Sequence, residues 1–127
     1  MSSPLRPRPH THSVMIDGHL HTWEVPRLWA LAEGLPTFEY EVRRFAGFDD
    51  VMWFGDGHPP TVRAVLDHVH RVQTADLSRP ILLSEVGRVM DGVHRLCRAL
   101  IEGRDTVTAV RFVPTPAADR VEVGRRR

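Results

Sequence analysis

The residues with the most obvious chemistry in this sequence gather in the stretch VMDGVHRLCRALIEG. Asp91 and Gly92 directly precede a segment of helical periodicity. Arg98 follows His94 by four positions and Arg95 by three, so these three side chains share one helical face. A helix N-terminus offers free backbone N–H groups and the positive end of the helix dipole. The stretch therefore predicts a cradle for a phosphate or carboxylate, built from guanidinium and imidazole groups beside open N–H groups.

The carboxylate of Asp91, just before the turn, could ligate Mg²⁺ or accept a proton. A plainer interpretation is that the polar face of the helix is solvated and that Asp91 only caps its N-terminus. The pattern alone leaves both interpretations open.

The elements that must position this stretch follow from hydrophobic periodicity and turn signals. The sequence predicts helices over residues 25–34, 61–73 and 93–102, and strands over residues 14–23, 37–45, 51–54, 80–84, 89–91 and 107–113. This mixed order indicates an α+β fold in which helices pack on a small mixed sheet.

The two later helices each show an apolar face. The apolar positions are Val62, Val65, Leu66, Val69 and Val72 in the first, and Val93, Leu96, Cys97, Leu100 and Ile101 in the second. Spacing of this kind is typical of a helix that packs one side on a core.

The chain of 127 residues is expected to form a single domain over residues 13–113. Residues 1–12 and 114–127 are rich in proline and arginine and lack apolar periodicity, so both are expected to be disordered basic tails.

The charge distribution argues against a nucleic-acid-binding face. All 17 basic residues are arginine, and the body of the domain carries 11 of them against 14 acidic residues, although the whole chain has a net charge of +1. A phosphate backbone requires a basic surface. No apolar run is long enough to span a membrane, no secretory signal is visible, and Cys97 is the single cysteine, so we expect a cytoplasmic protein without a membrane partner.

Residues 75–113 resemble the core of the ParB/sulfiredoxin-like superfamily. The match consists of a strand with Pro-Ile, a turn, a second strand, a glycine turn into a helix, and a last strand. The order Asp91-Gly92-Val93-His94-Arg95 is similar to the form in the free-serine kinases of this superfamily. The resemblance implies a ParB/sulfiredoxin-like fold in which Gly92, His94, Arg95 and Arg98 hold the phosphates of ATP, ADP or CTP, with Mg²⁺.

The departures from the family patterns argue against two of its activities. Val93 stands where sulfiredoxins carry their cysteine, which argues against reductive repair. The partition proteins have Gly-Glu-Arg-Arg at this turn and a helix-turn-helix domain after it. This sequence has neither, which argues against specific DNA binding.

A kinase of this kind also needs an acidic general base. The candidates are Glu24, Asp49, Asp50 and Asp56, and Asp56 lies in the acidic turn Gly-Asp-Gly-His.

Three histidines invite further interpretations. His70 on the helix over residues 61–73 is expected to approach the phosphate site. His19 and His21 would share one strand face and could chelate a metal with a third ligand, or simply be exposed polar residues.

The sequence thus predicts a small nucleotide-binding protein, with phosphotransfer to a small hydroxylated molecule as its activity. Asp91 and Asp56 would be the catalytic residues, and Asp91 the metal ligand. The alternative is a non-catalytic module that binds a ligand or a partner. A homodimer is an assembly that the sequence allows.

Overall fold

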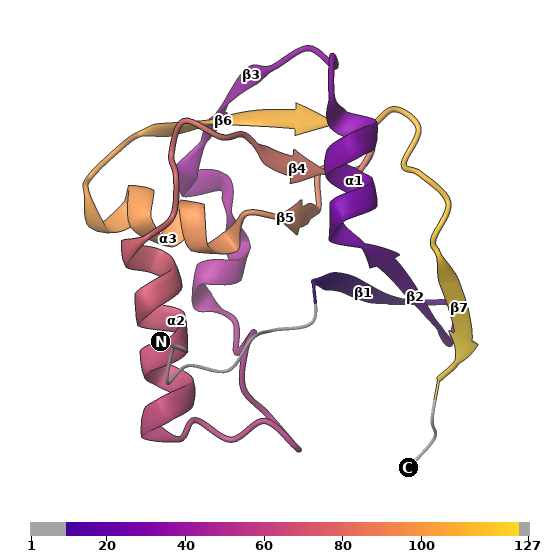
Figure 1. Cartoon of the computed structure of the whole chain (residues 1–127), viewed down its shortest axis with the longest axis horizontal. Coiled ribbons are helices and arrows are strands. Elements are labelled where there is room, and N and C mark those ends of the chain that lie inside the picture. The colour runs from indigo at the N-terminus through magenta and orange to yellow at the C-terminus, as the bar shows by residue number, and fades with distance from the viewer. Residues whose placement is uncertain (1–9, 125–127) are drawn as a thin grey trace, which may run out of the picture.

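A computed structural model describes residues 10–124 of the chain, which form an α+β architecture (Figure 1). The strands are β1 (Thr11–Ile16), β2 (His19–Glu24), β3 (Phe38–Glu41), β4 (Ile81–Leu83), β5 (Val89–Asp91), β6 (Thr106–Arg111) and β7 (Arg120–Val123). The helices are α1 (Val25–Ala32), α2 (Val62–Gln73) and α3 (Val93–Ile101), with the short 3-10 helices η1 (Val42–Arg44) and η2 (Ala46–Asp49). The expected fold class, α+β with helices packed on a small mixed sheet, is confirmed.

The strands form two sheets. In the four-stranded sheet the order is β3-β6-β4-β5, and β4 pairs with β6 in parallel while the other pairs are antiparallel. The second sheet, β1-β2-β7, is antiparallel throughout. The antiparallel pairing of β5 with β4 brings the turn from β5 into α3 beside the buried strand β4.

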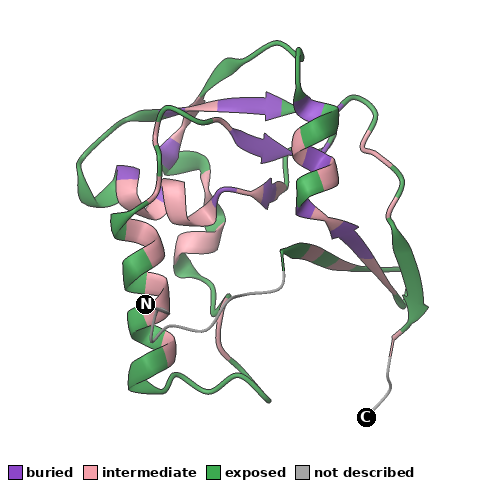
Figure 2. Ribbon diagram, viewed as in Figure 1, coloured by how far each residue is buried: buried purple, intermediate pink, exposed green. Residues whose placement is uncertain are grey.

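The central strands β4 and β6 of the mixed sheet are buried on both faces, whereas the edge strand β3 is partly exposed (Figure 2). Successive side chains of a strand point to opposite faces, so Ile81 and Leu83 belong to the cluster around Leu96 of α3. Leu82 belongs to the other cluster, which includes Leu28 of α1. Strand β4 therefore lies between two hydrophobic clusters, which explains its unbroken apolar sequence.

The expected strand over residues 14–23 is in fact a hairpin. Asp17 and Gly18 both adopt positive φ, at 50° and 78°, which suits the two-residue turn between antiparallel strands. The Asp-Gly pair that interrupts the strand pattern in the sequence is the turn of this hairpin.

The structure corrects the expected C-terminal boundary. Residues 114–124 are not a disordered tail, because β7 pairs with β2 and the buried Trp23 donates a hydrogen bond through Nε1 to the Pro116 carbonyl at 2.8 Å. Asp119 accepts a hydrogen bond from the backbone of Glu24. These polar contacts leave no periodic apolar signal in the sequence. Residues 125–127 lie outside the described residues.

The N-terminal segment expected to be disordered is described only in part. Residues 1–9 lie outside the described residues, and Thr11 and His12 belong to β1.

The segment between α1 and α2 also differs from expectation. The strand expected over residues 37–45 ends at Glu41 and continues as η1 and η2, while residues 51–54 form no strand. Buried Val42 donates its backbone N–H to the carbonyl of Asp105, and Phe45 and Phe48 pack against the core, so tertiary contacts end the strand early.

The apolar face of α2 is largely exposed, contrary to its amphipathic pattern. No residue of α2 is fully buried, and Val62, Val65, Leu66 and Val69 are exposed, because α2 packs on α3 along one side only. In α3, Leu96 is buried, but the expected core positions Leu100 and Ile101, at the C-terminal end of the helix, are exposed. Among the described residues, no helix has the length and apolar character needed to cross a membrane.

Candidate functional site

The turn from β5 into α3 forms as the sequence predicts. Gly92 adopts a φ of +119°, and a Cβ added at this position would lie 2.5 Å from Cγ2 of Ile81. Only glycine therefore allows the chain to turn so close to β4. As the N-cap of α3, Gly92 supplies no side-chain hydrogen bond to the first turn. The first-turn N–H groups of α3 lack the side-chain oxygen that usually satisfies one of them.

Asp91 is held by two neighbours rather than standing open. Its Oδ2 accepts a hydrogen bond from Nε1 of Trp29 at 2.8 Å and lies 3.6 Å from Nη1 of Arg95. The guanidinium of Arg95 also lies over the ring of Trp29, 5.3 Å from its centroid. Both partners contact the same oxygen of the Asp91 carboxylate. Asp91 is thus ion-paired with Arg95, whose side chain is only 15% exposed.

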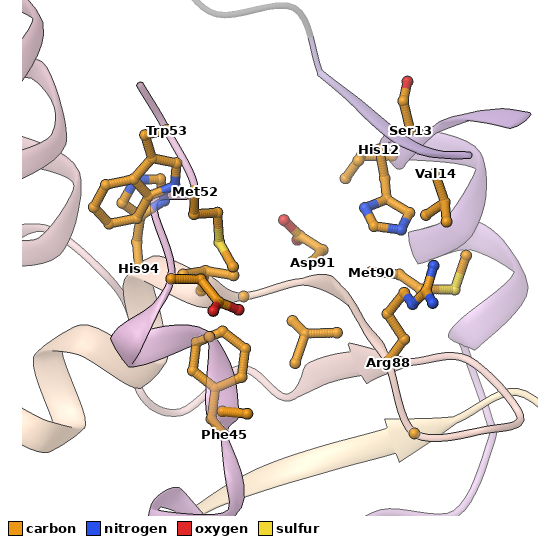
Figure 3. Close-up of a pocket in the computed structure, with 18 of the residues that line it drawn as sticks. His12, Ser13, Val14, Phe45, Met52, Trp53, Arg88, Met90, Asp91 and His94 are labelled. Carbon is orange, nitrogen blue, oxygen red and sulfur yellow. The ribbon is translucent and has the colours of Figure 1, made fainter. Parts of the chain in front are cut away.

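His94 belongs to an aromatic stack between two helices. Its Nε2 lies 2.9 Å from Nδ1 of His68 on α2, and Trp53 stacks on both rings, with centroid distances of 4.8 Å to His94 and 4.1 Å to His68. Figure 3 shows Trp53 lying across His94. The histidine that α2 brings to the motif is thus His68. The expectation for His70 is not met, because His70 is exposed and does not line the cavity described below.

Arg98 does not join the cradle either. Its Nη1 donates to the carbonyl of Gln73, the last residue of α2, at 3.1 Å and to that of Ala75 at 2.6 Å. Its Nε donates to Glu102. The guanidinium therefore satisfies backbone acceptors near the end of α2 and joins α2 to α3. This interaction requires the two helices to lie side by side, so the sequence of α3 alone could not reveal it.

A cavity of about 890 Å³ opens beside the start of α3, where Gly92, Val93 and His94 line it (Figure 3). The volume is within the range of small-molecule sites. Residues of η1, η2, α2, β1 and the turn between β4 and β5 complete its wall. The aromatic and thioether side chains in the lining are Tyr40, Phe45, Met52, Trp53 and Met90.

The charged lining is mainly basic. The charged side chains in the lining, besides histidines, are Arg44, Arg71, Arg88, Asp50 and Asp91. Arg44 lies 3.9 Å from Glu41, and Arg71 pairs with Asp67 at 3.3 Å. Arg88 forms no ion pair with another described residue, so its charge is available to a ligand.

His12 is a cavity residue that the sequence did not indicate. Its Nε2 is buried and has no hydrogen-bond partner among the described residues. Burial lowers the pKa of the imidazole below its ordinary value, the nearby guanidinium of Arg88 lowers it further, and the carboxylate of Asp91 partly opposes both. Figure 3 shows His12 beside Arg88, across the cavity from Trp53. No sequence signal marked His12, because it lies in the segment expected to be a tail.

The four acidic residues considered as general base differ in whether they line the cavity. Asp50 lines the cavity, whereas Asp49 and Asp56 do not, and Glu24 pairs with Arg120 at 2.8 Å. Asp56 is exposed in the turn closed by the bridge between Gly55 and His58.

The structure brings together no set of side chains that would support the metal-binding interpretations, among the residues that it describes. Within residues 10–124, no group of three or more His, Cys, Asp or Glu residues could hold a metal ion. His19 Nδ1 lies 3.0 Å from the Asp17 carbonyl, and His21 stacks on Trp23. Cys97 is half-buried, and burial raises the pKa of its thiol, which suits a packing residue better than a nucleophile.

Comparison with known proteins adds no relative: no family model, no curated protein and no solved structure matches the chain. The resemblance to the ParB/sulfiredoxin-like superfamily therefore stays a prediction, and the geometry of the cavity carries the functional argument.

Proposed function

We propose that the protein binds a phosphate-bearing small molecule of nucleotide size, with the phosphates at the N-terminus of α3. The observation that carries this proposal is the opening of an uncapped helix N-terminus into a cavity lined by three arginines. Backbone N–H groups and the helix dipole favour an anion at this position, and guanidinium groups recognise phosphate oxygens. The nucleotides expected from the sequence, ATP, ADP and CTP, belong to this class of ligand.

The walls of the cavity suit the rest of such a ligand. Phe45, Met52 and Trp53 offer apolar and aromatic surface at one side, against which a base could pack. Because the described residues form no metal centre of their own, a Mg²⁺ ion would be held by the phosphates, with Asp50 or Asp91 as protein ligands.

Calorimetric titration of the full chain with ATP, ADP and CTP in the presence of Mg²⁺ tests the proposal. Replacing Arg88 with alanine should weaken binding about tenfold, since one charge-assisted contact is lost. Arg104 pairs with Glu102 and does not line the cavity, so Arg104→Ala is the matched control and should leave the affinity unchanged. Absence of binding to all three nucleotides and to inorganic pyrophosphate would reject the proposal.

A second candidate function, phosphotransfer, is favoured by the position of Asp50 in the cavity. Asp91 forms an ion pair with Arg95 and accepts a hydrogen bond from Trp29, so Asp50 is the better general base. In this reaction the hydroxyl oxygen of the substrate forms a bond to the γ-phosphorus as the bond to the β-phosphate oxygen breaks. The hydroxyl proton passes to Asp50, and the nucleoside diphosphate leaves.

Nucleotide turnover separates this candidate from a non-catalytic binding module. Asp50→Asn should abolish release of the diphosphate while nucleotide affinity changes little, and Asp49→Asn, outside the cavity, is its control. Binding without turnover in the presence of a panel of small hydroxylated compounds would favour the binding module.

A further inference from the structure

Strand β7 leaves one edge of the three-stranded sheet open. Within residues 10–124 it pairs with β2 on one side only, and all four of its residues are exposed. Figure 1 shows β7 at the rim of the molecule, away from the mixed sheet. An open edge presents unpaired backbone N–H and carbonyl groups that can pair with another strand.

The hydrogen-bond alternation of the sheet identifies which residues face outward. Gly124 donates its N–H to the Gly18 carbonyl, and the register of β2 with β7 runs from this pair without a break. Antiparallel strands exchange hydrogen bonds at every second residue. Arg120 and Glu122 therefore bond to β2, whereas Val121 and Val123 direct their N–H and carbonyl groups to the open edge.

The charges on β7 make this edge complementary to itself. If Val121 pairs with Val121 of a second copy in antiparallel orientation, Arg120 of each chain lies opposite Glu122 of the other. Shifting the register by two residues would place the two Glu122 side chains opposite each other. Opposite charges stabilise directly opposed cross-strand pairs and like charges destabilise them, so the charges select the first register.

We propose that two copies of the chain associate through β7, about a two-fold axis at Val121, into a continuous six-stranded sheet. The backbone N–H and carbonyl of Val121 form the new hydrogen bonds with Val121 of the second copy. Arg120 already contacts Glu24 at 2.8 Å and Glu122 at 3.8 Å within its own chain, and on each side of the axis it extends this network to Glu122 of the second copy. Val121 and Val123, now 54% and 80% exposed, lose solvent contact along the joined edge. The association does not depend on the ligand proposed for the cavity.

The stoichiometry of the full chain tests this interface directly. Because a four-residue edge is small, the dimer is expected to be weak, so sedimentation equilibrium should measure the mass at protein concentrations up to about 1 mM. The mass should approach twice the 14.5 kDa of the monomer. Val121→Pro removes an outward N–H and should keep the protein monomeric, whereas Val121→Thr keeps that N–H and should still dimerise. Circular dichroism of both variants checks that the fold is intact.

Two further measurements keep the proposal falsifiable if Val121→Pro fails to fold. Glu122→Arg should raise the dimer Kd about tenfold or more, because Arg120 then lies opposite an arginine. Amide exchange followed by NMR should slow with protein concentration at Val121 but not at Glu122. A monomer at all concentrations would overturn the proposal. So would a dimer that Glu122→Arg leaves intact and that Leu66→Lys, on the exposed face of α2, abolishes.

Discussion

Gly92 offers the sharpest test of how the turn into α3 is built. Two separate costs follow from replacing it with alanine. A residue with a Cβ at a φ of +119° is strained by about 1–3 kcal/mol. The new Cβ would also lie 2.5 Å from Cγ2 and 2.8 Å from Cβ of Ile81, which is fully buried, and relieving such overlap costs a further 1–3 kcal/mol or so. Gly92→Ala should therefore lower the free energy of unfolding by about 4 kcal/mol, a large part of the 5–15 kcal/mol or so of a typical domain.

Gly87 is the matched control for this prediction. It also has a positive φ, +89°, but an added Cβ would meet no atom within 4 Å. Gly87→Ala should cost only the conformational part, about 2 kcal/mol. Urea unfolding followed by circular dichroism measures both variants. Equal losses of stability in the two proteins would show that the close approach of Gly92 to Ile81 does not constrain the turn, and would refute the reasoning.

Three further predictions concern single side chains. Arg98→Ala should lower the free energy of unfolding by about 1–2 kcal/mol, measured by urea unfolding, because the backbone carbonyls of Gln73, the last residue of α2, and of Ala75 lose their donor; unchanged stability would contradict the capping role. Asp119→Ala should speed amide exchange throughout β7, because the carboxylate that anchors this segment to Glu24 and Arg27 is lost. His12→Gln should reduce the loss of unfolding free energy that the protein shows as the pH falls. The pKa of His12 is lowered in the folded chain from its ordinary value of 6.5. Below that value the unfolded chain therefore takes up a proton that the folded chain does not, which destabilises the fold. Urea midpoints from about pH 8 to about pH 5 measure this slope, and equal slopes in the two proteins would contradict the burial of His12.

Local patterns predicted the parts of the fold that depend on neighbouring residues. The hairpin of β4 and β5, the glycine turn at Gly92 and the start of α3 at Val93 all follow from turn chemistry and periodicity close to them in sequence. The same holds for β6, whose apolar run is typical of a buried strand.

The roles of individual side chains could not be predicted in this way. Arg98, on the polar face of α3 as expected, meets the end of α2 only because the two helices lie side by side. His70 was the histidine of α2 expected to approach the motif, whereas the packing of α2 beside α3 brings His68 to His94. His12 reaches the cavity because the hairpin of β1 and β2 folds beside the turn of Arg88. Each of these outcomes depends on how elements distant in the sequence pack together.

The positive charge of the cavity comes from other arginines than those of the sequence motif. Within the motif, Arg95 is ion-paired with Asp91 and Arg98 is used by backbone carbonyls, so the helix supplies mainly its N–H groups. The positive charge of the cavity comes from Arg44, Arg71 and Arg88, which lie on η1, on α2 and in the turn before β5. An anion at the start of α3 would therefore connect η1, α2 and the turn before β5 to the first turn of this helix. Because such a ligand binds only the folded arrangement, it must stabilise the protein, by about 2.7 kcal/mol at a ligand concentration roughly one hundred times Kd.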